Sequence, residues 1–209
     1  MILEFNEYSD RESRTRTKSL SEEDFLEILK TECTNFSFEN DLLWRKSGNQ
    51  FGNFGLYLEG ERKGTIGRYN YHTFFDQRKD YPVPRFKSLI GSTTKEGADL
   101  LGSESHVYLV IPFNNAQLVF APTPDMALLS KLIDKDYSDD MFIMVEYLNN
   151  FKIPTDFLNK EMEKTGLTQY VSDSKLKFLG FEFFTNSSCL LLSIDKIDWL
   201  KNNNIVYEN

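Results

Sequence analysis

The chain has little of the chemistry that builds a metal centre or a disulfide framework. It contains two cysteines, Cys33 and Cys189, which lie far apart in the sequence, and two histidines, His72 and His106. No CxxC pair or other metal-ligand spacing is present. A structural metal site is therefore not expected, and a reduced, cytoplasmic protein is the default expectation.

Long hydrophobic runs are also missing. No apolar run approaches the roughly 20 residues that span a bilayer, and residues 1–14 lack the basic start and apolar core of a secretory signal. We therefore expect no contact with a membrane. The signatures of the commonest enzyme classes, GxGxxG, the P-loop, HExxH and GxSxG, are absent as well.

The chain is nevertheless long enough and apolar enough for a packed core. Its 209 residues are 40% hydrophobic and 14% aromatic, and no low-complexity linker or internal repeat divides them. We therefore expect a single domain over residues 1–209, with the polar residues 1–20 forming a loosely attached arm or a first strand. Strand patterns cluster at both ends of a helical middle, which predicts an α+β fold.

Charge is distributed unevenly along the chain. The formal net charge is −8, which disfavours general binding to nucleic acid. Residues 45–95, however, contain ten Lys and Arg against four Asp and Glu, a net charge of +6. This basic segment predicts a face that binds an anion or a nucleotide, although an ordinary solvated surface explains it equally well.

Capping residues and helical spacing predict several helices. Ser21 has the character of an N-cap and precedes three acidic residues and an apolar stripe, so a helix is expected over 22–33. Thr93 and Glu96 have the spacing of a capping box for a second helix over 94–101. Further helices are expected from residue 123, over 138–150, and from 155 to 166 with Phe157, Leu158 and Met162 pointing inward.

Short β-rich runs predict strands at 42–45, 55–58, 85–90, 106–113, 117–120, 177–184 and 188–194. The run 106–113 is almost continuously apolar, which is typical of a central strand. Asn114-Asn115 is a two-residue turn signal, so we expect the strands on either side of it to form a hairpin.

Polar side chains gather where a strand is expected to lead into the helix over 94–101. Hydroxyl and backbone N–H groups at such a junction suit an anionic or polar ligand, and an arginine from an earlier strand would complete a nucleotide-type site. The candidate residues are Arg45, Arg85, Ser88, Ser92, Thr93 and Thr94. For Arg45 alone, a cation that ends a strand and pairs with a surface carboxylate is the simpler interpretation.

The order of these residues resembles the ADP-ribosyltransferase superfamily. Arg45 in LLWRKS is followed by Arg85, by Ser92-Thr93-Thr94, by a helix and by the strand YLVIP. Over residues 42–125 this order is similar to that of short phage-encoded members of the superfamily. The resemblance implies split β-sheets with flanking helices, and NAD as a possible ligand of the arginines and hydroxyls. The whole sequence is also similar to T-even phage counter-defence proteins that act against a host toxin that ADP-ribosylates DNA.

One part of the family pattern is missing. The catalytic glutamate of the family lies near the start of a late strand, where this chain has Ser187, Ser188 and Cys189. Glu182 lies one strand earlier and would replace it only if the strands pair differently from our expectation. In an active enzyme, this glutamate would bind a ribose hydroxyl and stabilise the developing oxocarbenium ion. A fold that lacks its catalytic acid suggests a protein that binds rather than reacts.

Three hypotheses about function follow. The first is a non-catalytic phage protein that neutralises a host toxin by binding the toxin, its nucleotide, or its DNA substrate before or after ADP-ribosylation. The second is an active NAD-dependent ADP-ribosyltransferase that uses Arg45, residues 92–94 and Glu182. The third is a nucleic-acid-binding accessory protein that uses the basic segment 45–95 and its aromatic residues. The position of Glu182 relative to Arg45 and Thr93 distinguishes the first hypothesis from the second.

Overall fold

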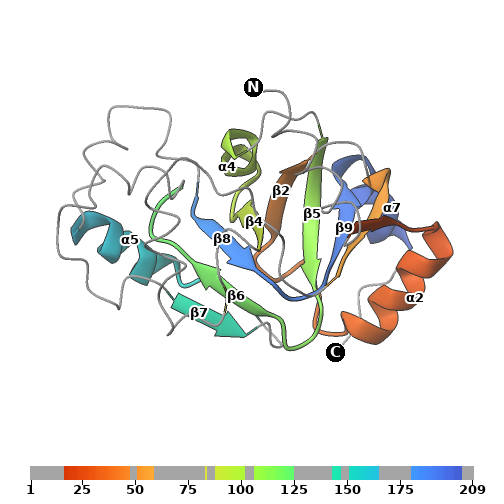
Figure 1. Ribbon diagram of the computed structural model, residues 1–209, viewed down its shortest axis with the longest axis horizontal. Helices are drawn as coiled ribbons and strands as arrows, with labels where there is room; N and C mark the ends of the chain where they lie inside the picture. The colour runs from red at the N-terminus through yellow and green to blue at the C-terminus, as the bar shows by residue number, and fades with distance from the viewer. Residues whose placement is uncertain are drawn as a thin grey trace, which may run out of the picture.

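The computed structural model describes residues 17–47, 51–58, 83, 88–101, 106–124, 143–146, 151–164 and 180–203. Within these residues, nine strands form one antiparallel sheet in the order β1-β3-β9-β5-β2-β4-β8-β6-β7 (Figure 1). The strands are β1 (Thr17–Ser19), β2 (Leu43–Ser47), β3 (Phe54–Tyr57), β4 (Leu89–Ser92), β5 (His106–Pro112), β6 (Gln117–Phe120), β7 (Ile143–Glu146), β8 (Glu182–Thr185) and β9 (Cys189–Ser193). The helices are α2 (Glu22–Glu32), α4 (Lys95–Leu100), α5 (Thr155–Lys164) and α7 (Ile197–Asn202), with a 3-10 turn, η6 (Ile194–Lys196), before α7. The fold is mixed α and β with an antiparallel sheet, which is compatible with the predicted α+β class.

Helix α2 forms where the capping pattern predicts it. The Ser21 hydroxyl accepts a hydrogen bond from the Asp24 backbone N–H at 3.1 Å, and the acidic first turn complements the helix dipole. Phe25 and Leu29 are buried and pack, together with α7, against one side of the sheet. We call this side the α2 face; it also carries Leu109 and Leu190.

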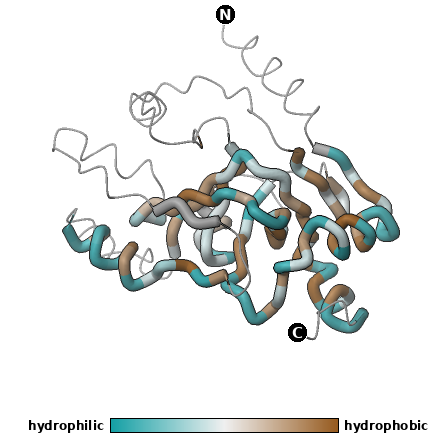
Figure 2. The backbone as a smooth tube through the Cα atoms, turned by 90° about the horizontal axis from the view of Figure 1, so that it is seen from below, coloured by the Kyte–Doolittle hydropathy of each residue, from teal (hydrophilic) through white to brown (hydrophobic). Residues whose placement is uncertain are grey.

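The opposite side of the sheet packs against α5 through the buried Leu158, and we call it the α5 face. Its core contains Leu43, Tyr108 and Leu191 from one end of the sheet and Leu118 and Phe183 from the other. Figure 2 shows the hydrophobic segments concentrated in the interior strands and hydrophilic segments on the helices at both ends. Most of the buried apolar side chains therefore come from strands, and they form cores on both faces of the sheet.

The sheet is joined unevenly along its width. Strands β2 and β5 share five register pairs, but β2 and β4 share one, Trp44 with Ser92. We call the β2–β4 boundary the seam. It divides the sheet into a five-strand half (β1, β3, β9, β5 and β2) and a four-strand half (β4, β8, β6 and β7).

The predicted hairpin at Asn114-Asn115 is wrong, although the turn itself is present. Asn115 has a positive φ of 63°, which suits asparagine at a tight turn. Strand β5 is flanked by β2 and β9, with five register pairs to each, so it has no open edge for β6. After the turn the chain crosses to the other half of the sheet, where β6 pairs with β8 and β7.

Two predictions in the helical middle of the sequence are also wrong. The helix expected over 138–150 is contradicted by β7, which pairs with β6 in antiparallel register. An apolar run with Ile and Val fits a buried strand as well as a helix, and the open edge of β6 decided between them. On α5, Phe157 is 38% exposed instead of inward-pointing, whereas Leu158 is buried and Met162 packs on the α5-face core.

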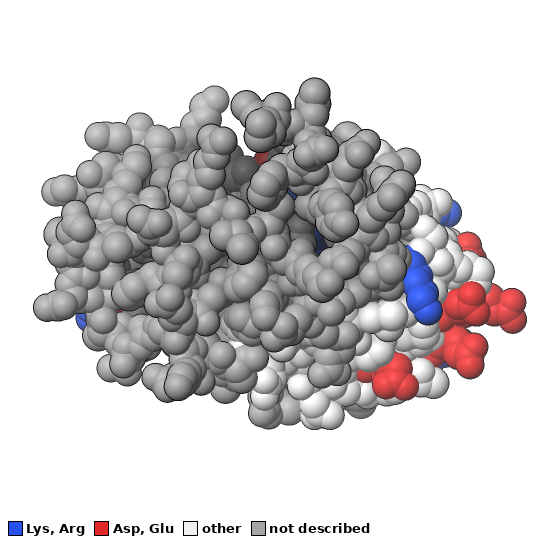
Figure 3. All heavy atoms as spheres, viewed as in Figure 1, with Lys and Arg blue, Asp and Glu red and all other residues white. Residues whose placement is uncertain are grey.

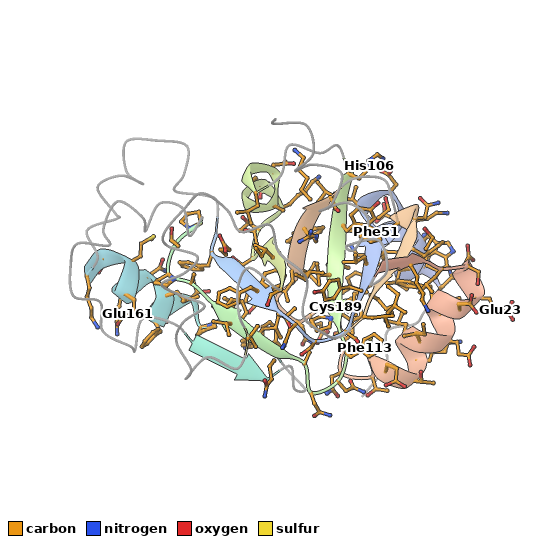
Figure 4. All side chains as sticks on the ribbon, in the orientation of Figure 1. Glu23, Phe51, His106, Phe113, Glu161 and Cys189 are labelled. Carbon is orange, nitrogen blue, oxygen red and sulfur yellow. The ribbon has the colours of Figure 1, made fainter. Side chains whose placement is uncertain are left out.

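Glu161 takes the buried position on α5 that the sequence assigned to Phe157. Its carboxylate pairs with the Lys164 ammonium one turn later, which offsets the cost of burying the charge. Figure 4 shows Glu161 on α5 and Glu23 on α2 at opposite ends of the molecule. The helix predicted from residue 123 and the stop at Gly166 fall largely outside the described residues.

Strand boundaries shift by a few residues from the predictions. The central strand is confirmed as β5, and the run 42–45 is confirmed as β2. Within the part of the chain that the structure describes, the strand expected over 177–184 is observed over Glu182–Thr185, and Gly180, with a φ of +65°, turns the chain just before it. Residues 177–179 lie outside that part. The strand expected over 85–90 is observed over Leu89–Ser92.

Candidate functional site

The predicted strand-to-helix junction is present at the end of β4. The strand ends at Ser92, whose hydroxyl accepts a hydrogen bond from the Thr94 N–H at 3.2 Å. Helix α4 then begins at Lys95, capped by the Thr94 hydroxyl, which accepts from the Gly97 N–H at 3.0 Å. The predicted cap, Thr93, is wrong by one residue.

Thr93 does not cap the helix because its side chain has another partner. Its hydroxyl accepts a hydrogen bond from the Phe181 N–H at 2.8 Å, and its own N–H donates to the Phe181 carbonyl at 2.9 Å. Gly180 lies so close to Thr93 and Thr94 that a Cβ there would overlap their side chains. Thr93 therefore fixes the position of the segment that enters β8.

Glu182 follows this anchored segment and lies beside Ser92. The two residues are register partners across β4 and β8, so their side chains share one face of the sheet. Both are 0% exposed. On the other side of Glu182, its N–H donates to the Thr123 carbonyl at 2.8 Å and its carbonyl accepts from the Ala121 N–H at 2.9 Å. The chain has thus buried a carboxylate beside a serine hydroxyl.

Arg45 lies near this pair along the backbone but points to the other face. Trp44 is the register partner of Ser92 and packs with the α2-face core. Because successive side chains of a strand alternate, Arg45 points to the α5 face. There its guanidinium donates to the Ile90 carbonyl across the seam at 2.6 Å, and it lies close enough to Cys189 to act on that thiol.

The structure therefore brings some of the predicted site residues together and separates others. Ser92, Thr93, Thr94 and Glu182 form one connected cluster on β4, β8 and the start of α4. Ser88 is fully buried one residue before β4. Arg45 contacts β4 next to the cluster, through the Ile90 carbonyl. Arg85 and most of the basic segment 45–95 lie outside the described residues.

Two residues next to the cluster were missed at the level of sequence. Thr123 is 0% exposed and lies against β8; its TPD context suggested a helix start instead. Gly91 lies where β2 and β4 approach closely, and a Cβ there would overlap the Trp44 carbonyl and the Phe183 ring. A glycine inside a short strand is the signal that could have indicated this close approach.

The two cysteines are buried thiols that take no part in this cluster. Burial raises the pKa of Cys33 well above its usual range, with a further rise from nearby Cys189. Burial also raises the pKa of Cys189, and the Arg45 guanidinium opposes that rise. Both side chains therefore stay neutral at physiological pH and behave as small apolar groups.

No group of three or more metal-ligating side chains occurs in the part of the chain that the structure describes. Over the same residues, no helix is both long and apolar enough to cross a membrane. No protein-family model matches the chain, and neither the curated proteins nor the solved structures contain a significantly similar one.

Proposed function

We propose that the protein is an ADP-ribosyltransferase-like phage counter-defence protein that acts by binding and not by transfer chemistry. In this proposal it neutralises a host toxin that ADP-ribosylates DNA, in the cytoplasm of the host cell. The family resemblance over residues 42–125 supports the proposal, as does the division of the antiparallel sheet at the seam. The split β-sheets of that family are the finer fold assignment that goes with it.

One observation carries the non-catalytic part of the proposal: the candidate catalytic groups occupy opposite faces of the sheet. A transferase needs an arginine and a carboxylate on the same NAD molecule. Here Glu182 is fully buried toward the α2 face, while Arg45 points to the α5 face and binds a main-chain carbonyl. This separation of the two groups supports binding without transfer chemistry.

Charge favours the toxin itself as the partner over its DNA substrate. The net charge of −8 opposes contact with a polyanion, and a toxin that acts on DNA must present a cationic surface. Figure 3 shows acidic side chains gathered on the edge where α2 lies. Helix α2 has Glu22, Glu23 and Asp24 in its first turn, and all three are exposed.

The direct test is to measure DNA ADP-ribosylation by such a toxin while the protein is titrated in. We expect inhibition that is complete near one equivalent and weakens as salt is added, because complementary charge drives the association. The protein alone, with labelled NAD, should label neither DNA nor protein. Inhibition only at large excess, or none, would contradict the proposal.

A second candidate function is active ADP-ribosyl transfer. The pairing of Ser92 with Glu182 favours it, because the transfer reaction would use a hydroxyl beside a carboxylate. It is tested by calorimetric titration of NAD into the intact protein, the Arg45→Ala variant and a Lys160→Ala control with an exposed charge removed. Micromolar binding that is lost only in Arg45→Ala, together with transfer that Glu182→Gln abolishes, would replace the binding proposal with this one.

The third hypothesis, a nucleic-acid accessory role, depends on residues 45–95, most of which lie outside the described residues. A steep loss of DNA binding with rising salt would support it. The overall acidity of the chain disfavours it.

A further inference from the structure

The strand boundary with the fewest register pairs lies beside the buried carboxylate of the sheet. At the seam, Trp44 and Ser92 form one register pair, whereas β4 and β8 share four on the other side of β4. Glu182 is the β8 partner of Ser92, so it lies one strand away from the seam. The seam has the fewest register pairs of any strand boundary in the described sheet, and fewer pairs mean fewer interstrand hydrogen bonds to break there.

The two faces of the sheet differ in how they cross the seam. On the α5 face one core runs across it, since Leu43 and Tyr108 from the five-strand half pack in the same cluster as Leu89 and Phe183 from the four-strand half. Among the described residues, the α2 face carries two separate cores. The cluster under α2 and α7 belongs to the five-strand half, and a small cluster of Val83, Ile90, Val119 and Phe184 belongs to the other.

This asymmetry defines a direction of opening. The continuous core on the α5 face holds the halves together there, and the divided cores on the α2 face lose little apolar contact if the halves separate. Ser92 and Glu182 point to the α2 face, the side that would open. Their exposure is 0% in the closed arrangement.

Two consecutive cations of β2 close the seam, one on each face. Arg45 donates to the Ile90 carbonyl of β4 on the α5 face. On the α2 face the Lys46 ammonium lies 3.2 Å from the Asp99 carboxylate of α4, which follows β4 directly. The Lys46 and Asp99 side chains are 20% and 52% exposed, so this clasp is a weak, salt-screened one.

We propose that the seam is a built-in opening. The two halves separate on the α2 face about the α5-face core, release the Lys46–Asp99 clasp, and give solvent or a ligand access to Ser92 and Glu182. Gly91 sets the closed state, because its missing side chain lets the Trp44 carbonyl and the Phe183 ring approach β4. The opening is a property of the sheet and does not require that the protein bind a toxin.

Native-state hydrogen exchange, followed residue by residue by NMR, tests the opening. Amides of β2 and β4 that point across the seam should exchange at least about tenfold faster than the slowest amides of β5 and β9, through an event that depends little on urea. Exchange of the seam amides at the rate and urea dependence of β5 and β9 would overturn the proposal, because the sheet would then open only by global unfolding.

Variants of the clasp sharpen the test. Lys46→Met and Asp99→Asn should each speed seam exchange by about twofold to fivefold while the slowest β5 amides stay unchanged. Lys95→Met, which removes a neighbouring exposed charge from α4, is the matched control. An equal effect from Lys95→Met, or no effect from either clasp variant, would contradict the proposed clasp.

Access to the carboxylate gives an independent readout. Coupling of Glu182 to a small amine by a water-soluble carbodiimide, mapped by mass spectrometry, should be slow beside that of the exposed Glu23 and should accelerate in the clasp variants in step with seam exchange. Gly91→Ala should accelerate it further if that variant folds. Glu182 coupling that is independent of the clasp would show that the seam does not control access.

Discussion

The two halves of the sheet differ in what they bury. The five-strand half is covered on both faces by apolar side chains, with α2 and α7 on one side and the α5-face core on the other. The four-strand half and its immediate flanks bury polar groups that are 0% exposed: Ser88, Ser92, Thr123, Glu182 and Thr185. Buried polar groups cost stability unless they are hydrogen-bonded, and they concentrate where specificity or chemistry requires them. The four-strand half and its flanks thus carry the cluster of Ser92, Thr93, Thr94 and Glu182, whereas Arg45 is the candidate residue of the five-strand half.

The largest expected effect on stability is in the core of the five-strand half. Phe25 is 0% exposed and its ring lies 5.1 Å from that of Phe54, so Phe25→Ala should lower the free energy of unfolding by about 3–5 kcal/mol. Urea denaturation followed by circular dichroism measures the loss. The exposed Phe157→Ala on α5 is the control and should change stability by less than about 1 kcal/mol. Similar losses in the two variants would remove the contrast between core and surface.

The stability of the four-strand half should depend on individual side-chain hydrogen bonds. Thr93→Val keeps the shape of the side chain but leaves the Phe181 N–H without its hydroxyl acceptor, at a cost of about 1–3 kcal/mol. Thr31→Val on α2 is a matched control, because the Thr31 hydroxyl is exposed and donates only to carbonyls of its own helix, those of Glu27 and Ile28. If Thr31→Val lowers the free energy of unfolding as much as Thr93→Val, the four-strand half does not depend on side-chain hydrogen bonds more than α2 does.

The cysteines test how tightly the five-strand half is closed. Burial raises the pKa of both thiols above the unfolded value of about 9, so the folded state holds protons that the unfolded state releases at high pH. These thiols leave the free energy of unfolding unchanged below about pH 9 and lower it above that pH, by up to about 1.4 kcal/mol per thiol for each pH unit. The comparison is the pH dependence of unfolding in the intact protein and in a Cys33→Ala, Cys189→Ala variant.

Thiol reactivity gives the same comparison a kinetic form. We expect Cys33 and Cys189 to react with a thiol reagent at pH 8 only as fast as the protein unfolds. Rapid reaction in the native protein would mean that the five-strand half opens locally, and it would contradict the proposal that the sheet opens first at the seam.

The smallest expected effect is at the turn that leads from one half to the other. Asn115 has a φ of 63°, a conformation that glycine adopts without strain, so Asn115→Gly should change stability by less than about 1 kcal/mol. Asn115→Ala should be the less stable of the pair, by about 1 kcal/mol. Thermal unfolding of the two variants side by side measures the difference, and Asn115→Ala being equal to or better than glycine would mean that the turn relaxes.

Local sequence signals account for the five-strand half well. The Ser21 cap with its acidic turn predicted α2, and short apolar runs predicted β2, β3 and β9. These elements follow from capping, helical spacing and short apolar runs, which act over a few residues. The errors lie elsewhere: the hairpin after β5, the helix in place of β7, and Thr93 as the cap. Each of these was decided by a partner far along the chain.

The candidate site shows the same division. The sequence alone determined that hydroxyls would gather at the end of a strand beside a short helix, because strand composition and an N-cap are local properties. Only the tertiary structure decided that Glu182 lies beside Ser92 and that Arg45 points away from both. Strand order and register set which residues meet, and a shift of one position turns every side chain to the opposite face. That information resides in the pairing of β2, β4 and β8, which no stretch of this sequence specifies by itself.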